Sequence, residues 1–163
     1  LHGKDDVNKM LITTKKRWVY FKDYGKTTQA QFFTEEEKKK AKIASFNSNA
    51  SVWIENLGKG KYKVHELPVE AQFSCINAIE IMDVNRDKNL DIVFAGNNFG
   101  NEVFIGRYDA SNGGVLLGNG KGGFTFYRDS GFEVPGDAKS LIRINNQLIA
   151  GQNRGAIKVF KNL

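Results

Sequence analysis

Residues 78–98 read AIEIMDVNRDKNLDIVFAGNN, and this stretch decides the fold. Two apolar runs rich in Ile, Val and Phe flank a polar segment, and runs of this length and composition predict two β-strands joined by a loop. The segment is either a cation-binding loop or a polar turn whose side chains satisfy the turn backbone. Its oxygen-bearing side chains recur at every second position: Asp83, Asn85, Asp87, Asn89 and Asp91.

Outward from this stretch, the chain repeats itself. The pattern Leu-Gly-x-Gly-Lys occurs at 57–61 and again at 117–121, each time between an apolar run and an aromatic residue. The run LDIVFAGNN at 90–98 is similar to QLIAGQN at 147–153. The repeated unit is therefore strand, turn, strand, connection, strand, Gly-rich hairpin, strand. A four-stranded meander recurring at roughly 60 residues predicts the blades of a β-propeller.

We therefore expect an all-β chain that forms part of a β-propeller of four-stranded antiparallel blades, with one short surface helix. Propellers need about 4 to 8 blades to close. The chain would then be the C-terminal portion of a larger propeller, completed by the remaining blades or by self-association through open edges. The expected parts are strands plus the short helix in 1–45, the end of a blade in 46–67, a complete blade in 76–128 and an incomplete last blade in 138–161.

Within residues 1–45, the apolar runs at 10–13 and 18–21 predict strands. The segment TEEEKKKAKIAS predicts the helix over 34–44, because Thr34 can cap its first turn and Glu37 follows three residues later as in a capping box. Acidic residues also precede basic ones, which suits the helix dipole.

The composition narrows the function classes. The formal net charge is +6, but the lysines of 38–42 directly follow three glutamates, a mixed pattern typical of a solvated surface, so no nucleic-acid partner is expected. Cys75 is the only cysteine, which excludes an intrachain disulfide and a cysteine-built zinc site. No apolar run is long enough to span a membrane, and neither G-x-S-x-G nor H-E-x-x-H occurs.

The stretch 78–98 resembles the FG-GAP or VCBS-type repeat of integrin α-subunit propellers and of many bacterial secreted proteins. The loop of that repeat reads Asp-x-Asx-x-Asp-Gly-x-x-Asp, and this chain has Arg86 and Lys88 where loop positions four and six are glycine. WIENLGKGKYKVHELPVEAQFS at 53–74 and GRYDASNGGVLLGNGKGGF at 106–124 look like the C-terminal region of Bacteroidetes VCBS proteins, some of which carry an ASPIC/UnbV-type segment. The resemblance covers about residues 45–163.

The resemblance implies an extracytoplasmic protein, which is periplasmic, outer-membrane-associated or secreted. It also implies that a Ca²⁺ ion is held by the loop. The ligands would be Asp83, Asn85, Asp87 and Asp91, with Asn89 at the position where a backbone carbonyl usually serves.

A long connection at 97–114 follows the second strand of the expected complete blade. It is longer than a hairpin needs, and binding surfaces tend to lie on long loops of a rigid scaffold. Arg107 and Asp109 would either hold the connection by an internal ion pair or belong to a ligand surface. The candidate ligand residues are Phe104, Arg107, Tyr108 and Asp109.

The sequence assigns no catalytic residue. It favours a non-catalytic binding or scaffold module that binds a protein or a glycan, with Ca²⁺ stiffening one loop. The alternative is a fragment of a propeller enzyme whose catalytic residues lie in blades outside this segment.

Overall fold

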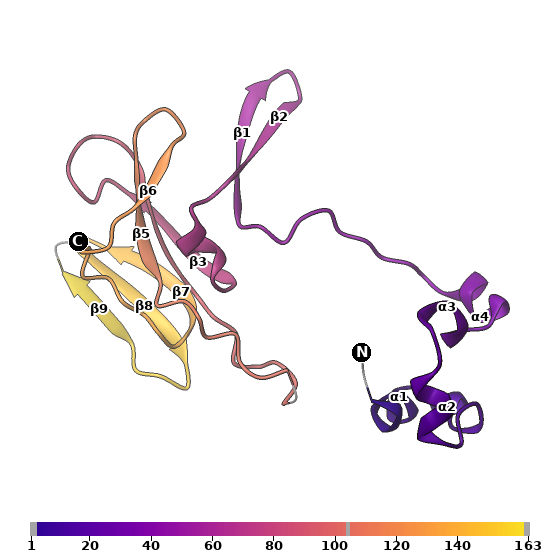
Figure 1. Ribbon diagram of the computed structural model, residues 1–163. Helices are drawn as coiled ribbons and strands as arrows, with labels where there is room; N and C mark the ends of the chain where they lie inside the picture. The colour runs from indigo at the N-terminus through magenta and orange to yellow at the C-terminus, as the bar shows by residue number, and fades with distance from the viewer. Residues whose placement is uncertain (1–2, 104, 162–163) are drawn as a thin grey trace. The chain divides into compact units, whose positions relative to one another are not determined.

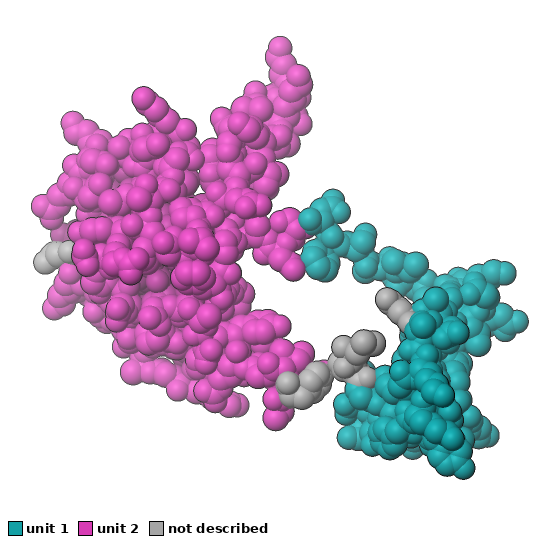
Figure 2. Space-filling view, in the orientation of Figure 1, with its two compact units in different colours: residues 1–47 teal, residues 48–163 magenta. Residues whose placement is uncertain are grey.

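The computed structural model describes residues 3–103 and 105–161, which divide into two units, residues 1–47 and 48–163 (Figures 1 and 2). The first unit is helical, and the second contains three antiparallel sheets. Strands thus dominate the fold, as the composition predicts. In the described part of the chain, no helix combines the length and the apolar character needed to cross a membrane.

The strands predicted at 10–13 and 18–21 are wrong, and so is the expectation of a single helix. The first unit contains α1 (Lys4–Met10), the 3₁₀ helix η1 (Ile12–Lys16), α2 (Phe21–Gly25), α3 (Gln29–Phe32) and α4 (Glu35–Lys40). Trp18 is the reason, because its buried ring packs against Tyr24 and Phe32 with ring centroids 5.4 and 4.9 Å away. Short turns bring these aromatic rings together, whereas Ile12 stays 74% exposed, with no partner strand beside it.

Helix α4 begins as its sequence predicts, although it ends at Lys40 instead of residue 44. Thr34 accepts a hydrogen bond from the Glu37 backbone N–H at 3.2 Å, and the Glu37 carboxylate accepts from the Thr34 backbone N–H at 2.8 Å. Arg17 binds the same carboxylate through Nη2 at 2.9 and 3.0 Å. The Arg17 hydrogen bonds, together with the Thr34 backbone, lower the pKa of Glu37 from 4.5 to about 2.

The second unit contains the predicted hairpin, the predicted four-stranded meander and a three-stranded sheet. Strands β3, β4, β5 and β6 pair in chain order, as do β7, β8 and β9, and a 3₁₀ helix, η2 (Val69–Gln72), follows the hairpin. The hairpin consists of β1 (Val52–Gly58) and β2 (Lys61–Glu66). The meander consists of β3 (Ile76–Met82), β4 (Asp91–Gly96), β5 (Gly114–Gly118) and β6 (Phe124–Phe126), and the last sheet of β7 (Asp137–Ile144), β8 (Gln147–Asn153) and β9 (Lys158–Lys161).

Two cores cover opposite faces of the four-stranded sheet. On one face, Val93, Ala95 and Val115 pack against Leu148 and Ala150 of the three-stranded sheet. On the other face, Ile92, Phe94 and Leu116 pack with Leu67 and Ala71, and Trp53 of the hairpin joins this cluster. All six residues of β4 are therefore buried, with the three-stranded sheet packed on one face of the meander and Leu67, Ala71 and Trp53 on the other.

Two β-bulges mark equivalent positions in the larger sheets. The pairing of β3 with β4 shifts at Asn77, and the pairing of β7 with β8 shifts at Lys139. When the two sheets are aligned at their bulges, Ala95 corresponds to Gly151. The sequence match of Ala95-Gly96 with Ala150-Gly151 instead pairs Ala95 with Ala150, one position away. Because side chains alternate along a strand, one residue of shift reverses the faces. Ala95 and Ala150 therefore reach the same core from opposite sheets.

The two Leu-Gly-x-Gly-Lys motifs form hairpin turns, as predicted. Gly60 and Gly120 occupy the same position in their motifs and have φ angles of 73° and 67°. This left-handed conformation is readily adopted by glycine and costs energy for most other residues. The motif therefore fixes where β1 turns into β2 and where β5 turns towards β6.

Candidate functional site

The loop between β3 and β4 gathers three of the five predicted metal ligands. The backbone N–H of Asp87 donates to Asp83 Oδ1 and to Asn85 Oδ1, both at 3.1 Å, so these two oxygens lie on the same amide. The Lys88 N–H donates to Asp83 Oδ2 at 2.9 Å, and the Asn89 N–H donates to Asp87 Oδ1 at 2.8 Å. The loop backbone is therefore wrapped around the side chains of Asp83, Asn85 and Asp87.

The other two predicted ligands serve a neighbouring hairpin instead. Asp91 is fully buried, and its two oxygens accept from the Val84 N–H at 2.7 Å and from the Gly118 N–H at 2.8 Å. Asn89 Oδ1 lies against Gly120, where an added Cβ would come within 2.4 Å of it. Asp91 thus fastens the loop to the start of the β5–β6 turn, and the side chain of Asn89 packs on that turn.

Arg86 and Lys88 adopt the backbone conformation that the glycines of the resembled repeat would adopt freely. Their φ angles are 63° and 72°. The loop thus closes without glycine at these positions, and both long side chains are solvent-exposed. The Asn89 backbone N–H and the Asn85 side chain lower the pKa of the Asp87 carboxyl, which favours its charged form.

The oxygens of Asp83, Asn85 and Asp87 are of the kind that a hard cation takes. Asp83 and Asp87 keep lone pairs beyond those used by the backbone N–H groups, since a carboxylate has about four acceptor sites. Asn85 adds an amide oxygen, and carboxylate and amide oxygens are the ligands that Ca²⁺ takes. The described residues contain no group of three Asp, Glu, His or Cys side chains suited to a metal. A bound ion would therefore rely on two carboxylates, one amide, backbone carbonyls and water.

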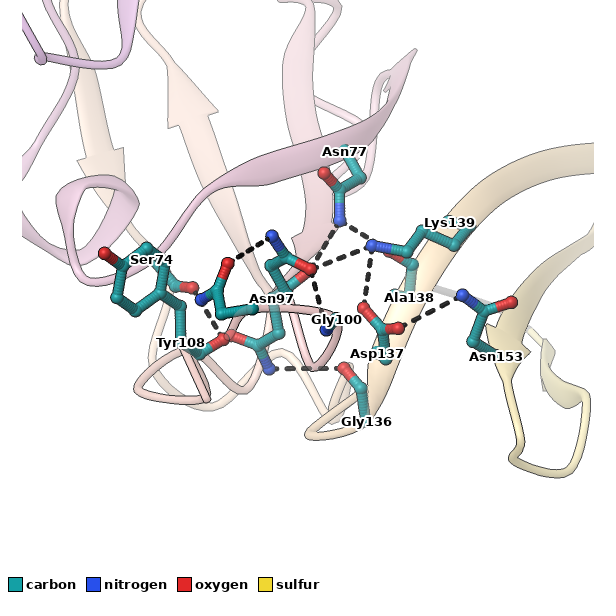
Figure 3. Close-up of polar contacts among 12 residues, drawn as sticks. Ser74, Asn77, Asn97, Gly100, Tyr108, Gly136, Asp137, Ala138, Lys139 and Asn153 are labelled. Carbon is teal, nitrogen blue, oxygen red and sulfur yellow. Dashed lines mark hydrogen bonds and ion pairs between the residues drawn. The ribbon is translucent and has the colours of Figure 1, made fainter. Parts of the chain in front are cut away.

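A second polar assembly lies at the opposite end of the sheets, centred on Asn97 (Figure 3). Asn97 is fully buried at the end of β4, with a φ of 81°. Its side-chain amide donates to the carbonyls of Ser111, Pro135 and Gly136 at 2.6, 3.1 and 3.2 Å, and its Oδ1 accepts from the Ser111 N–H at 3.2 Å. One residue thereby holds the connection 97–113 to the segment before β7.

The bulge residues of the two sheets meet at the same point. Asn77 Nδ2 donates to the Asn97 carbonyl at 2.6 Å, and Lys139 Nζ donates to that carbonyl at 3.2 Å (Figure 3). Asn77 Nδ2 also reaches the Ala138 carbonyl at 2.9 Å. The two bulges therefore aim an amide and an ammonium group at one acceptor between β3 and β7.

Asp137 lies beside this junction and is buried. Lys139 Nζ is 2.7 Å from its Oδ1, an ion pair without the angles of a hydrogen bond, and Asn153 Nδ2 donates to its Oδ2 at 3.2 Å. Burial opposes ionisation of this carboxyl, but Lys139, Asn153 and the Phe99 backbone N–H together outweigh it and lower the pKa of Asp137. Asp137 is therefore held as a buried anion.

Three of the four predicted ligand-surface residues lie on the described part of the connection 97–113. Asn98 and Tyr108 exchange backbone hydrogen bonds at 2.8 and 2.9 Å, which closes the connection into a narrow excursion. Arg107, Tyr108 and Asp109 are exposed, and Tyr108 is 52% exposed. The fourth predicted residue, Phe104, lies outside the described residues.

The internal ion pair that Arg107 and Asp109 could form is absent from residues 3–103 and 105–161. The Arg107 guanidinium carbon lies instead 4.8 Å from the ring centroid of Phe99. Beside it is a pocket of about 310 Å³, formed by the connection, the start of β7 and the β8–β9 turn. Its lining residues are Phe99, Gly100, Arg107, Asp137, Asn153 and Arg154.

Sequence reasoning missed Asn77, Asn97, Asp137 and Lys139. Asn97 and Asn153 stand within the two similar stretches LDIVFAGNN and QLIAGQN, so the repeat itself carried a signal for them. Asn77 and Lys139 act through β-bulges, which no residue pattern in this sequence marks.

Comparison of the chain with protein-family models, with curated proteins and with solved structures finds no match.

Proposed function

We propose that the chain is a non-catalytic binding and scaffold module of a secreted or envelope-associated protein, and that it binds a glycan or a protein at the end of the sheets where residues 97–113 lie. The observation that carries this proposal is the fastening of that connection. Buried Asn97 holds both of its flanks, and the bridge between Asn98 and Tyr108 closes it. Tyr108 lies in that bridge and Arg107 directly precedes it, so a backbone held there without a ligand would reduce the entropic cost of binding.

A partial β-propeller is the architecture we propose for this module. The first strands of the two larger sheets, β3 and β7, lie side by side, with Arg143 Nε 3.7 Å from Glu80 Oε1. The three-stranded sheet packs against one face of the meander, and equivalent bulges at Asn77 and Lys139 fall in the first strand of each of these sheets. The hairpin β1–β2 would then supply the outer strands of a preceding blade.

Apolar side chains that remain exposed on the two larger sheets support the same architecture. Ile79 and Ile81 of β3 are 50% and 45% exposed, and Ile142 and Val159 of the last sheet are 53% and 50% exposed. Apolar residues paired across strands in this way are usually covered by another layer. In this proposal the remaining blades, or a second copy of the chain, cover them.

Calcium is proposed as a ligand of the loop between β3 and β4. Asp83, Asn85 and Asp87 would hold the ion, and the ion would stiffen the first half of the loop. The support is that Asp83 Oδ1 and Asn85 Oδ1 share the Asp87 N–H, while Asp87 Oδ1 accepts from the Asn89 N–H two residues further on. This site lies at the opposite end of β4 from the proposed ligand surface, so its role would be to stiffen the scaffold.

A glycan array followed by titration of the strongest hit tests the binding function. Tyr108→Ala and Arg107→Ala are each expected to weaken binding by about tenfold, because central aromatic and arginine side chains usually dominate such surfaces. Arg86→Ala, at the other end of the sheets, is the matched control and should leave the affinity unchanged. A hit whose affinity survives both substitutions in the connection would place the binding surface elsewhere on the module.

A further inference from the structure

The pocket beside the connection brings two arginines together. Arg107 comes from the connection and Arg154 from the β8–β9 turn, and both line the same pocket. Within the described part of the chain, neither of them forms an ion pair with an acidic side chain. Arginine presents a planar fork of N–H donors that matches a carboxylate, so this pair is available for an anionic group of a ligand.

Arg154 occupies its position at a conformational cost. Its φ is 53°, in the left-handed region, and the next residue is Gly155. A glycine or asparagine in that turn would adopt this conformation with less strain. Arg154 therefore lies at the pocket although glycine or asparagine would adopt this backbone conformation with less strain.

Asp137 supplies a second and different feature of the pocket. The described residues contain only two buried side-chain polar atoms without a hydrogen bond, Asn101 Nδ2 and Asp137 Oδ1, and both lie at this end of the sheets. Buried acceptors are nearly always hydrogen-bonded in folded proteins. The Asp137 side chain lines the pocket and is 6% exposed, and Lys139 Nζ already lies 2.7 Å from its Oδ1, so a hydroxyl group of a ligand would donate to the accessible edge of this carboxylate.

The combination restricts the chemical class of the ligand. The arginines favour a carboxylate, whereas buried anionic Asp137 repels a second carboxylate beside it and accepts a hydrogen bond from a neutral O–H group. A simple acidic side chain carries the carboxylate without the hydroxyl groups. A sugar acid carries both.

We infer that this pocket binds a uronic-acid residue of an acidic glycan, with its carboxylate on Arg107 and Arg154 and a ring hydroxyl donating to the Asp137 carboxylate. This inference rests on the proposed binding function and specifies the ligand for it. It predicts selectivity for acidic over neutral sugars of the same ring structure.

Calorimetric titration of the whole chain tests the inference. The probes are tetrasaccharides of galacturonic acid, mannuronic acid and hyaluronan, each beside its carboxyl-reduced counterpart, which keeps the hydroxyl groups and lacks the charge. At least one acidic probe is expected to bind roughly tenfold more tightly than its reduced form, as a two-arginine carboxylate contact implies. Arg154→Ala should remove that difference. Arg128→Ala, which changes an exposed arginine outside this pocket, should leave it intact.

Three outcomes would overturn the inference. If the reduced sugars bind as tightly as the acids and Tyr108→Ala abolishes both, the proposed function stands and the acidic ligand is wrong. If hexaglutamate binds more tightly than every sugar and depends on Arg154, the ligand is an acidic peptide. If no probe binds while an unrelated glycan binds through Tyr108, the pocket is not the carboxylate site. Circular dichroism of each variant checks that exposed Arg154 and Arg128 can be replaced without unfolding.

Discussion

The four-stranded and three-stranded sheets join their first two strands in very different ways. Residues 83–90 connect β3 to β4, whereas Asn145 and Asn146 alone connect β7 to β8. In both sheets the pairing continues to the last residue before the connection, with Met82 opposite Asp91 and Ile144 opposite Gln147. Residues of the loop and of the short turn line one pocket of about 240 Å³, so the two connections lie close together.

The difference shows that strand pairing does not require the longer connection. Asn145 has a φ of 53°, as expected for asparagine in a tight hairpin turn, and that turn is enough to set the register of the last sheet. The loop 83–90 therefore carries something beyond closure of the hairpin. Its Asp and Asn side chains bind its own backbone and, through Asp91, the next hairpin.

The largest expected effect is on Asp91. Replacing Asp91 with Ala leaves the Val84 and Gly118 N–H groups without their buried acceptor and should destabilise the chain by about 3 kcal/mol. The matched control is Gln147→Ala, at the equivalent first position of β8, which should cost less than about 1 kcal/mol. Urea unfolding measures both. Equal losses for the two variants would show that the loop is not fastened through Asp91.

The second largest expected effect is that of calcium, which should act on the loop 83–90 and not on the short turn at 145–146. At saturating Ca²⁺ the melting temperature is expected to rise by about 4 °C or more, because a ligand that binds only the folded state adds to its stability. Asp87→Ala should abolish the rise, and Asn145→Gly in the short turn should leave it unchanged. Differential scanning calorimetry with and without the metal measures it. If the wild-type chain melts at the same temperature with and without Ca²⁺, the proposal that the loop binds calcium is wrong.

A smaller effect is expected at Lys88. Its left-handed conformation costs a lysine about 1–2 kcal/mol, and glycine avoids this cost but gains freedom in the unfolded chain. Lys88→Gly should therefore stabilise the protein by about 0.5 kcal/mol and lower the Ca²⁺ concentration at half-saturation, since a nearby cation is lost. Asn145→Gly is the control and should gain less, because asparagine tolerates this conformation. Destabilisation by Lys88→Gly would contradict the strain assigned to this position.

The smallest effect concerns acid. The Asn89 N–H holds the pKa of Asp87 below its usual 3.8. A carboxyl whose folded-state pKa is lowered contributes stability above its unfolded value and loses it as the pH falls through the folded value. The protection of the Asn89 amide, measured against its intrinsic exchange rate at the same pH, should therefore fall below pH 3.8, whereas the protection of the uncharged turn at 145–146 should not change. NMR titration of Asp87 and amide exchange at both connections measure this, and an Asp87 pKa above 3.8 would reverse the expected sign.

The sequence contained most of the strand unit because its signals there are local. Each signal specifies a short segment that is present in the structure. These signals are the alternating apolar residues, the two Leu-Gly-x-Gly-Lys turns and the Asp and Asn residues of the loop 83–90. The loop also adopts the backbone conformation that glycines would have indicated, although Arg86 and Lys88 stand there.

The errors have long-range causes. The runs at 10–13 and 18–21 resemble strands, but Trp18 is buried against Tyr24 and Phe32 by contacts that no short pattern encodes. The repeat was aligned one residue out of register, since the bulges at Asn77 and Lys139 depend on strand pairing. Asp137 gained its role only when β7 brought it beside Asn153 and the Phe99 backbone.

Strand β4 is buried on both faces and hydrogen-bonded on both edges. Opening it requires that both cores and two strand pairings give way together, so its amides should be the last in the chain to exchange with solvent. The loop 83–90 ends at this strand, and the connection 97–113 begins at it. The strand that is expected to open last thus anchors both proposed sites. A ligand at either site would therefore stabilise the same cooperative unit.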